Sequence, residues 1–254
     1  MGLIAGPCAI EEPDRLFKIA HGVAREASEN GLGAVFKASF DKANRTRHDS
    51  YRGPGLIEGL ALLREVRKQT GLRITTDVHL PSQVGPVAEV ADLLQVPAFL
   101  CRQTDLLVEA GRSGRPVNIK KGQFMAPEDM GHAVDKLRHG GASDIIVTER
   151  GTTFGYRDLV VDMRSIVQLK DLGVTVCFDA THSVQQPGAA GGSSGGDRRF
   201  VPALCKAALA AGADVLFLEV HDAPDQARSD PDTQWPLHQL GQLLRDVHPY
   251  SAKP

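Results

Sequence analysis

The sequence predicts an α/β fold, a single (β/α)8 or TIM barrel, from three observations. The length of 254 residues is typical of one such barrel. Eight short apolar runs alternate with longer amphipathic stretches. Those runs are almost continuously apolar, as parallel strands buried on both faces are. We therefore expect one barrel domain to span residues 1–254.

The eight predicted strands follow one another at the spacing of a strand–helix repeat. They cover residues 3–10, 34–40, 73–79, 91–96, 116–121, 144–150, 175–180 and 215–221. A helix is predicted over 55–70, where Leu60, Leu63 and Val66 keep helical spacing and Gly71 supplies a stop. Another is predicted over 200–211.

A doubly wound open sheet is the alternative fold. It would normally carry a glycine-rich turn after an early strand, and the sequence contains no GxGxxG motif. The segment GAAGGSSGG at 188–196 interrupts the seventh strand–helix connection. Its composition is that of a flexible chain, so it is predicted to be a mobile loop over one barrel face, with a passive surface insertion as the alternative.

Composition excludes several classes of protein. The 29 Lys and Arg against 31 Asp and Glu argue against a nucleic-acid binder. No apolar run approaches the roughly 18–20 residues that a membrane span needs. The first residues have neither the basic nor the long apolar region of a signal peptide. The four cysteines lie far apart and form no CxxC pair, which predicts a protein of a reducing compartment.

Cationic side chains collect where the predicted strands end. Active sites of (β/α)8 barrels form at these carboxyl ends. Several cations that converge there, in a chain of net charge −2, fit a ligand with more than one anionic group, such as phosphates and a carboxylate. The alternative is a structural ion pair for each cation, with Asp41, Asp77 or Glu149 as partners. The cations are Lys37, Lys42, Arg45, Arg102, Lys120 and Arg150.

Four further side chains could bind a metal ion. Cys8, His182 and Glu219 end strands one, seven and eight, which become neighbours when the barrel closes. Asp230 follows in the loop after strand eight. A thiolate, an imidazole and carboxylates together suit Zn²⁺, Fe²⁺ or Mn²⁺. The spacing alone is a weak signal, because a single Cys in a strand is usually a small buried apolar residue.

Six segments match one enzyme family in order. They are GPCAIE (6–11), FKASFDKANR (36–45), AFLCRQTD (98–105), KKGQF (120–124), TERGTTFGY (148–156) and FDATHSVQ (178–185). The chain thus resembles the 3-deoxy-D-manno-octulosonate 8-phosphate (KDO8P) synthases from Leu3 to about Leu240. The resemblance implies a homotetrameric, cytoplasmic transferase that condenses phosphoenolpyruvate with D-arabinose 5-phosphate and water and releases phosphate. The product supplies the Kdo sugar of lipopolysaccharide biosynthesis.

The resemblance also implies three sets of site residues. The metal ligands are Cys8, His182, Glu219 and Asp230, for Zn, Fe or Mn. The catalytic residues are His182, Asp230, Cys8 and Lys120. The substrate-binding residues are Lys37, Ser39, Lys42, Asn44, Arg45, Thr46, Asp77, Arg102, Lys120, Gln123, Arg150 and Gln185. Within the last set, Lys120 and Arg150 are expected to hold the phosphate of phosphoenolpyruvate, and Arg45 and Thr46 that of the aldose.

Single positions refine the resemblance. Metal-independent members have Asn where this chain has Cys8, which indicates the metal-dependent class. The related shikimate-pathway synthase, which takes erythrose 4-phosphate, typically shows Lys-Pro-Arg-Thr where this chain has KANRT at 42–46, and this favours the pentose phosphate. Thr46 replaces the family's usual Ser, so the phosphate pocket is expected to be slightly tighter.

Two other readings stay open. One is the shikimate-pathway synthase, and the other is a non-catalytic barrel that binds sugar phosphates.

Only seven residues precede Cys8, fewer than in many members of the family, so the barrel floor is expected to be less covered or the start to be truncated.

Overall fold

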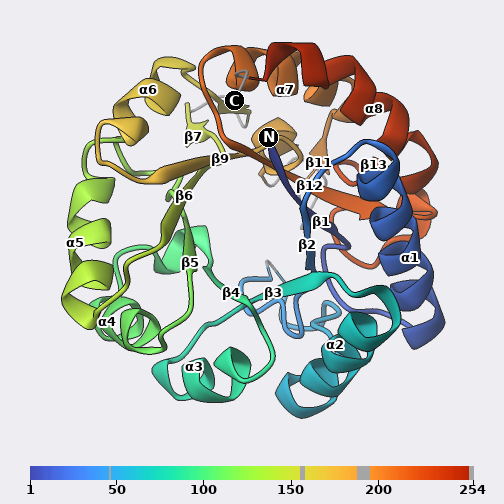
Figure 1. Ribbon diagram of the computed structural model, residues 1–254, viewed down its shortest axis with the longest axis horizontal. Coiled ribbons are helices and arrows are strands. Elements are labelled where there is room, and N and C mark those ends of the chain that lie inside the picture. The colour runs from blue at the N-terminus through green and yellow to red at the C-terminus, as the bar shows by residue number, and fades with distance from the viewer. Residues whose placement is uncertain (46, 155–157, 188–194, 252–254) are drawn as a thin grey trace.

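The barrel is closed by its first and last long strands. The computed structural model describes residues 1–45, 47–154, 158–187 and 195–251. Strand β1 pairs in parallel with β2 on one side and with β12 on the other, so that Ala5 lies opposite both Phe36 and Leu218 (Figure 1). The barrel strands, in order around the ring, are β1 (Gly2–Gly6), β2 (Ala34–Lys37), β3 (Arg73–Asp77), β4 (Leu93–Val96), β5 (Val117–Lys120), β6 (Ile145–Glu149), β9 (Thr175–Asp179) and β12 (Val215–His221).

The helices form an outer ring around the strands (Figure 1). They are α1 (Pro13–Glu29), α2 (Leu56–Thr70), α3 (Pro81–Ala88), α4 (Thr104–Arg112), α5 (Met130–Gly140), α6 (Arg164–Lys170), α7 (Val201–Ala210) and α8 (Leu240–Val247). The α2 helix ends where predicted, because Gly71 adopts φ 70° and donates its N–H to the Arg67 carbonyl. The predicted (β/α)8 fold is confirmed, and each predicted strand overlaps an observed one.

Short elements decorate the carboxyl ends of the strands. They are the antiparallel pairs β7–β8 (Thr152–Thr153, Leu159–Val160) and β10–β11 (Gln185–Gln186, Gly195–Gly196), the strand β13 (Trp235–Pro236), and the 3-10 turns η1 (Ala98–Leu100), η2 (His182–Val184), η3 (Arg198–Phe200), η4 (Pro224–Gln226) and η5 (Leu237–Gln239). A further 3-10 turn, η6 (His248–Tyr250), follows α8 instead. Most of the predicted mobile loop, residues 188–194, lies outside the described residues.

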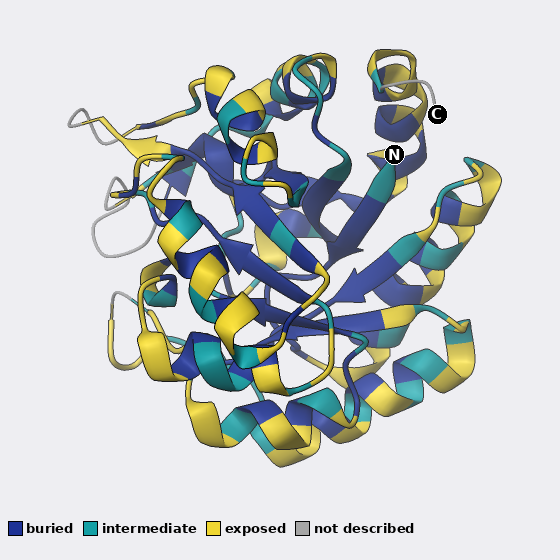
Figure 2. Cartoon of the chain, turned by 60° about the vertical axis from the view of Figure 1, so that its left-hand side comes forward, coloured by how far each residue is buried: buried dark blue, intermediate teal, exposed yellow. Residues whose placement is uncertain are grey.

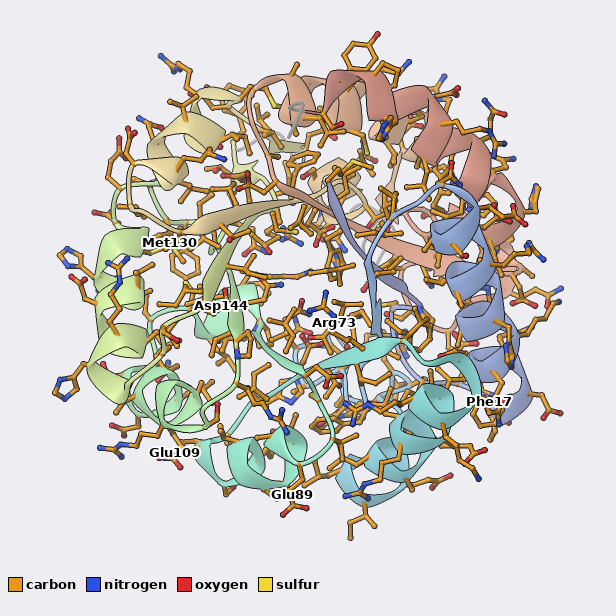
Figure 3. The ribbon with its side chains drawn as sticks, in the orientation of Figure 1. Phe17, Arg73, Glu89, Glu109, Met130 and Asp144 are labelled. Atoms are coloured by element: carbon orange, nitrogen blue, oxygen red, sulfur yellow. The ribbon has the colours of Figure 1, made fainter. Side chains whose placement is uncertain are left out.

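The hydrophobic core lies mainly between the strands and the helices, where the buried faces of both meet (Figure 2). Side chains also fill the interior of the ring of strands (Figure 3), as in a packed barrel rather than a pore. Ile4, Val35, Leu93, Cys177 and Phe217 form a small separate cluster from five of these strands. Among the described residues, none of the helices combines the length and the hydropathy that crossing a membrane requires.

Candidate active site

A cavity of about 620 Å³ opens at the carboxyl ends of the barrel strands. Most of the predicted site residues line it: Lys37, Lys42, Asn44, Arg45, Asp77, Lys120, Gln123, Arg150, His182, Gln185, Glu219 and Asp230. Two others are buried against it, since the Ser39 hydroxyl donates to Asp77 and the Cys8 thiol donates to Asp230 Oδ2 at 3.1 Å. The fold therefore brings the predicted cation ring and the predicted metal ligands to one place.

Two predicted residues are not in this group. Arg102 lines a separate cavity of about 560 Å³ together with Cys101 and His132. Arg102 lies between η1 and α4, and the second cavity that it lines is bordered mainly by residues of α5 and of the segment before it. Thr46 lies outside the described residues, and its predicted phosphate contact stays a prediction.

Cys8 reaches the cavity because β1 approaches β2 closely just before it. A Cβ on Gly6 would lie 2.0 Å from the Lys37 carbonyl oxygen, so only glycine fits there. Beyond Gly6 the chain leaves the strand, and the Cys8 thiol donates to Ser229 Oγ at 3.0 Å. Burial and the neighbouring Glu219 carboxylate raise the pKa of this thiol, so it is protonated unless a cation is bound beside it.

Three of the predicted ligands converge to within one coordination sphere. A donor atom each from Cys8, Glu219 and Asp230 lie within 4.8 Å of one another. Glu219 Oε2 is buried and has no hydrogen-bond partner among the residues described, which leaves a lone pair available to a cation. Asp230 has φ 48°, a left-handed conformation that aspartate tolerates better than most residues and that turns its carboxylate inward.

His182 stands beside this group with its tautomer fixed. Its Nδ1 lies 2.7 Å from Asp179 Oδ2, and its Nε2 lies 3.6 Å from Glu219 Oε1. Burial opposes ionisation of Asp179, but His182 and Lys120 outweigh it and hold the pKa of that carboxyl well below its usual range. The ionised carboxylate accepts a hydrogen bond from Nδ1–H, so in the neutral ring Nε2 carries the free lone pair. The thiol, imidazole and two carboxylates therefore fit a divalent metal of the Zn, Fe or Mn type.

The opposite side of the cavity presents cations. Lys120 Nζ donates to Asp179 Oδ2 at 2.5 Å and lies 3.6 Å from the centre of the Phe217 ring. Arg150 Nη2 donates to Gln185 Oε1 at 2.7 Å. Its Nη1 is buried without a hydrogen-bond partner in the described part of the chain. A buried guanidinium with an unused donor, next to a lysine, is suited to an anionic group such as a phosphate.

Some cations of the predicted ring do form structural ion pairs, but with carboxylates other than those expected. Lys37 Nζ is 2.8 Å from Glu219 Oε1, and Lys120 pairs with Asp179. Of the carboxylates expected as partners, Asp41 pairs with Arg52 and Glu149 with Lys121 at 3.6 Å, whereas Asp77 shares the cavity wall with Lys37 and Lys42. The cations of the ring are thus partly neutralised, yet they still line the cavity.

Sequence reasoning missed several residues of this site. Asp179, which touches both His182 and Lys120, was expected only as a strand end. Gln95 and His79 line the cavity as well. Ser229, beside Cys8, follows no strand directly. A signal existed for Gln95, because it is a polar residue inside an otherwise apolar run of β4.

Comparison with known proteins defines the class of protein that has this fold and site. Residues 1–250 match the model of the DAHP synthetase I family. The chain is 58% identical over 245 residues to the 2-dehydro-3-deoxyphosphooctonate aldolase of Nitratidesulfovibrio vulgaris (strain DP4), covering 96% of this chain and 90% of the relative. It is 57% identical over 247 residues to the protein of the same name from Syntrophotalea carbinolica, covering 97% and 89%.

A third relative of that name, from Desulfatibacillum aliphaticivorans, is 54% identical over 242 residues, covering 95% of this chain and 89% of the relative. The chain therefore belongs to the DAHP synthetase I family and, within it, to the 2-dehydro-3-deoxyphosphooctonate aldolases, or KDO8P synthases. This confirms the resemblance found in the sequence and makes the chain an enzyme of the transferase type.

Proposed function

We propose that this enzyme condenses phosphoenolpyruvate with D-arabinose 5-phosphate and water to give 3-deoxy-D-manno-octulosonate 8-phosphate and phosphate, in the cytoplasm, as a step of lipopolysaccharide biosynthesis. The names of the relatives support this reaction. The observation that carries it is a single cavity with cations on two sides and a metal-type donor set between them.

Each substrate has a set of residues in this proposal. Lys120 and Arg150 hold the phosphate of phosphoenolpyruvate, with Gln123 near its charged groups. Arg45, on the loop after β2, holds the aldose phosphate, with Asn44 near the sugar hydroxyls. In support, Arg45 lines the cavity from the side opposite β5 and β6 and donates to Ser229 Oγ at 2.6 Å. Two anions can approach each other only where such cations offset their repulsion, and fixing them face to face is itself catalytic.

The bond changes follow from this placement. The C3 carbon of phosphoenolpyruvate attacks the aldehyde carbon of the open-chain sugar, and water adds at C2. The C2–O bond to phosphate then breaks, and Lys120 stabilises the charge of the departing phosphate. Asp230 accepts a proton of the water, and the aldehyde oxygen takes up a proton as it becomes a hydroxyl.

A divalent metal fits the same site. Cys8, His182, Glu219 and Asp230 would hold Zn²⁺, Fe²⁺ or Mn²⁺, and the ion would supply Lewis acidity that polarises the aldehyde or acidifies the water. The burial of Cys8 and the unpartnered oxygen of Glu219 support this assignment.

We also infer a homotetramer, as the family resemblance implies. Phe99 and Phe124, at the carboxyl end of the barrel, are 54% and 57% exposed, which supports coverage of this rim by another copy of the chain. Light scattering coupled to size exclusion measures the mass and tests this inference.

Phosphate release from phosphoenolpyruvate and arabinose 5-phosphate, before and after EDTA and with each metal added back, tests the proposed function. We expect turnover that is lost with EDTA and restored by metal. Turnover with erythrose 4-phosphate instead would identify the shikimate-pathway reaction. A ligand-induced melting shift without turnover on either aldose would identify a non-catalytic sugar-phosphate-binding barrel.

A further inference from the structure

A row of buried polar side chains runs around the inside of the barrel from β6 to β3. Thr148 Oγ1 donates to Asn118 Oδ1 at 2.6 Å, and Asn118 Nδ2 donates to Gln95 Oε1 at 2.9 Å. Gln95 Nε2 then donates to Asp77 Oδ1 at 2.6 Å. The strand register puts Asp77 beside Gln95 and Gln95 beside Asn118. We call Thr148, Asn118 and Gln95 the polar belt.

Chemistry fixes the direction of every bond in the belt. The Asp77 carboxylate can only accept, so Gln95 must turn its amide nitrogen toward it and its amide oxygen toward Asn118. By the same reasoning Asn118 must donate to Gln95 and accept from Thr148. All the donors therefore point toward Asp77, and chains of this kind polarise one another. Ser39 donates to the other oxygen of the Asp77 carboxylate, so Asp77 accepts hydrogen bonds both from the polar belt and from Ser39.

The belt has no evident role in stability alone. Its three side chains are at most 1% exposed, in a barrel interior whose neighbouring layer is apolar. Apolar residues of similar size would fill such positions without the desolvation of amides and hydroxyls. Only Gln95 of the three lines the cavity, so Asn118 and Thr148 can act on bound ligands only through other residues.

The end point of the belt does face the cavity. Asp77 lines it together with Lys37 and Lys42. Burial opposes ionisation of Asp77, but Lys37 and Lys42 outweigh it and hold the pKa of the carboxyl well below its usual range. Lys37 Nζ and Lys42 Nζ lie 2.8 Å and 3.9 Å from Glu219 Oε1, so both lysines also face the carboxylate at the end of β12.

We propose that Gln95, Asn118 and Thr148 are positioning residues of the active site, which hold the Asp77 carboxylate in one orientation in the cavity wall that it shares with Lys37 and Lys42. This inference rests on the proposed function. It extends the site below the cavity, to Asn118 and Thr148, which do not line it.

Thr148→Val tests the proposal with a nearly isosteric change that removes only the first donor. The matched control is Thr76→Val, because Thr76 is equally buried and its hydroxyl has no hydrogen-bond partner among the described residues. We expect Thr148→Val to lower kcat/KM for phosphoenolpyruvate about fivefold and Asn118→Leu to lower it about tenfold or more. Losses of this size are expected when reacting groups are slightly displaced. Thr76→Val should leave it unchanged.

A double-mutant cycle separates positioning from structure. If the belt acts through Asp77, Thr148→Val should cause no further loss in an Asp77→Asn background, whereas independent effects would multiply. Each variant is assayed well below its own melting temperature. A belt that is merely structural would lower the melting temperature with kcat/KM unchanged, or multiply with Asp77→Asn, and either result would overturn the proposal.

The affinity for phosphoenolpyruvate, measured by calorimetry on the same variants, keeps the two proposals distinguishable. If the wild type binds phosphoenolpyruvate but does not turn over with arabinose 5-phosphate, the proposed function fails. The same cycle read on the dissociation constant then still decides the belt: a weaker affinity in Thr148→Val that vanishes in the Asp77→Asn background supports it, and equal affinities contradict it.

Discussion

The two sides of the cavity use the same strand-end geometry for opposite kinds of ligand. On the β1–β12 side, Cys8, Glu219 and Asp230 converge as electron-pair donors. On the β5–β6–β9 side, Lys120 and Arg150 converge as hydrogen-bond donors, and one guanidinium nitrogen has no partner among the residues that the structure describes. His182 and Asp179 join the two sides. The barrel thus fixes where functional groups meet, and the residue type at each strand end decides which charge they accept.

The largest expected effect comes from removing the sulfur on the metal side. We expect Cys8→Ala to lose its bound metal and to turn over about 100-fold more slowly or worse. This loss exceeds the one typical of mutating a residue that only supports a metal ligand. Metal content by elemental analysis and phosphate release measure both. Cys205→Ala is the matched control, since Cys205 is equally buried but lies on α7. Full turnover of the wild type after chelation would contradict the comparison.

Asp179→Asn should weaken both sides at once. The carboxylate accepts from His182 on one side and Lys120 on the other, so an amide would disturb the histidine tautomer and leave the lysine unpaired. We expect metal affinity and turnover to fall about 10- to 100-fold. Exposed Asp162, which pairs with Arg164, provides the control Asp162→Asn. If only metal affinity or only the KM for phosphoenolpyruvate changes, the two sides are not joined through Asp179.

Arg150→Lys should affect the anion side alone. A lysine keeps the charge but loses the planar pair of donors, of which one now bonds Gln185. The KM for phosphoenolpyruvate should rise about tenfold, equivalent to about 1.4 kcal/mol. Metal content and the KM for the aldose should not change. A parallel rise of both KM values would show that Arg150 serves both substrates.

Lowering the pH below about 4 should destabilise the folded protein, because the buried carboxylates of Asp77 and Asp179 are then forced toward protonation. The pKa values of Asp77 and Asp179 lie well below their usual range in the folded chain. Their stabilisation is therefore complete above the unfolded pKa of about 4 and is lost as the pH falls toward the folded values, by at most about 1.4 kcal/mol per pH unit for each group. Melting temperatures between pH 3 and 7 measure this, and Asp179→Asn should flatten the decline.

The sequence predicts the fold well because every barrel strand is an apolar run. The first predicted strand extends too far. Gly6 approaches Lys37 and Pro7 has no N–H to donate, so the ladder stops before Cys8. Most residues that line the active-site cavity can be predicted as site residues because they directly follow a barrel strand. Arg102 is an exception: it follows β4, but a 3-10 turn intervenes, and its role in binding stays a prediction.

The supporting residues are harder to predict. Asn118 and Thr148 stand inside short strands, and the register pairs them with Ile146 and Lys120, so that their hydrogen bond crosses diagonally between the strands. Ser229 and Asp230 come from a loop, whose path depends on distant contacts such as the one between the Arg228 N–H and Glu11. One-dimensional spacing contains neither piece of information.

The pairing of β1 with β12 also matters during synthesis of the chain. Cys8 emerges from the ribosome more than 200 residues before Glu219 and Asp230. Until then β1 can pair only with β2, and its pairing with β12 must wait. Pairing of strands so distant in sequence is slow, which leaves the nascent chain open to proteases and chaperones. Cys8, Glu219 and Asp230 therefore come together only when β12 pairs with β1, so the metal site forms only in a chain whose barrel has closed.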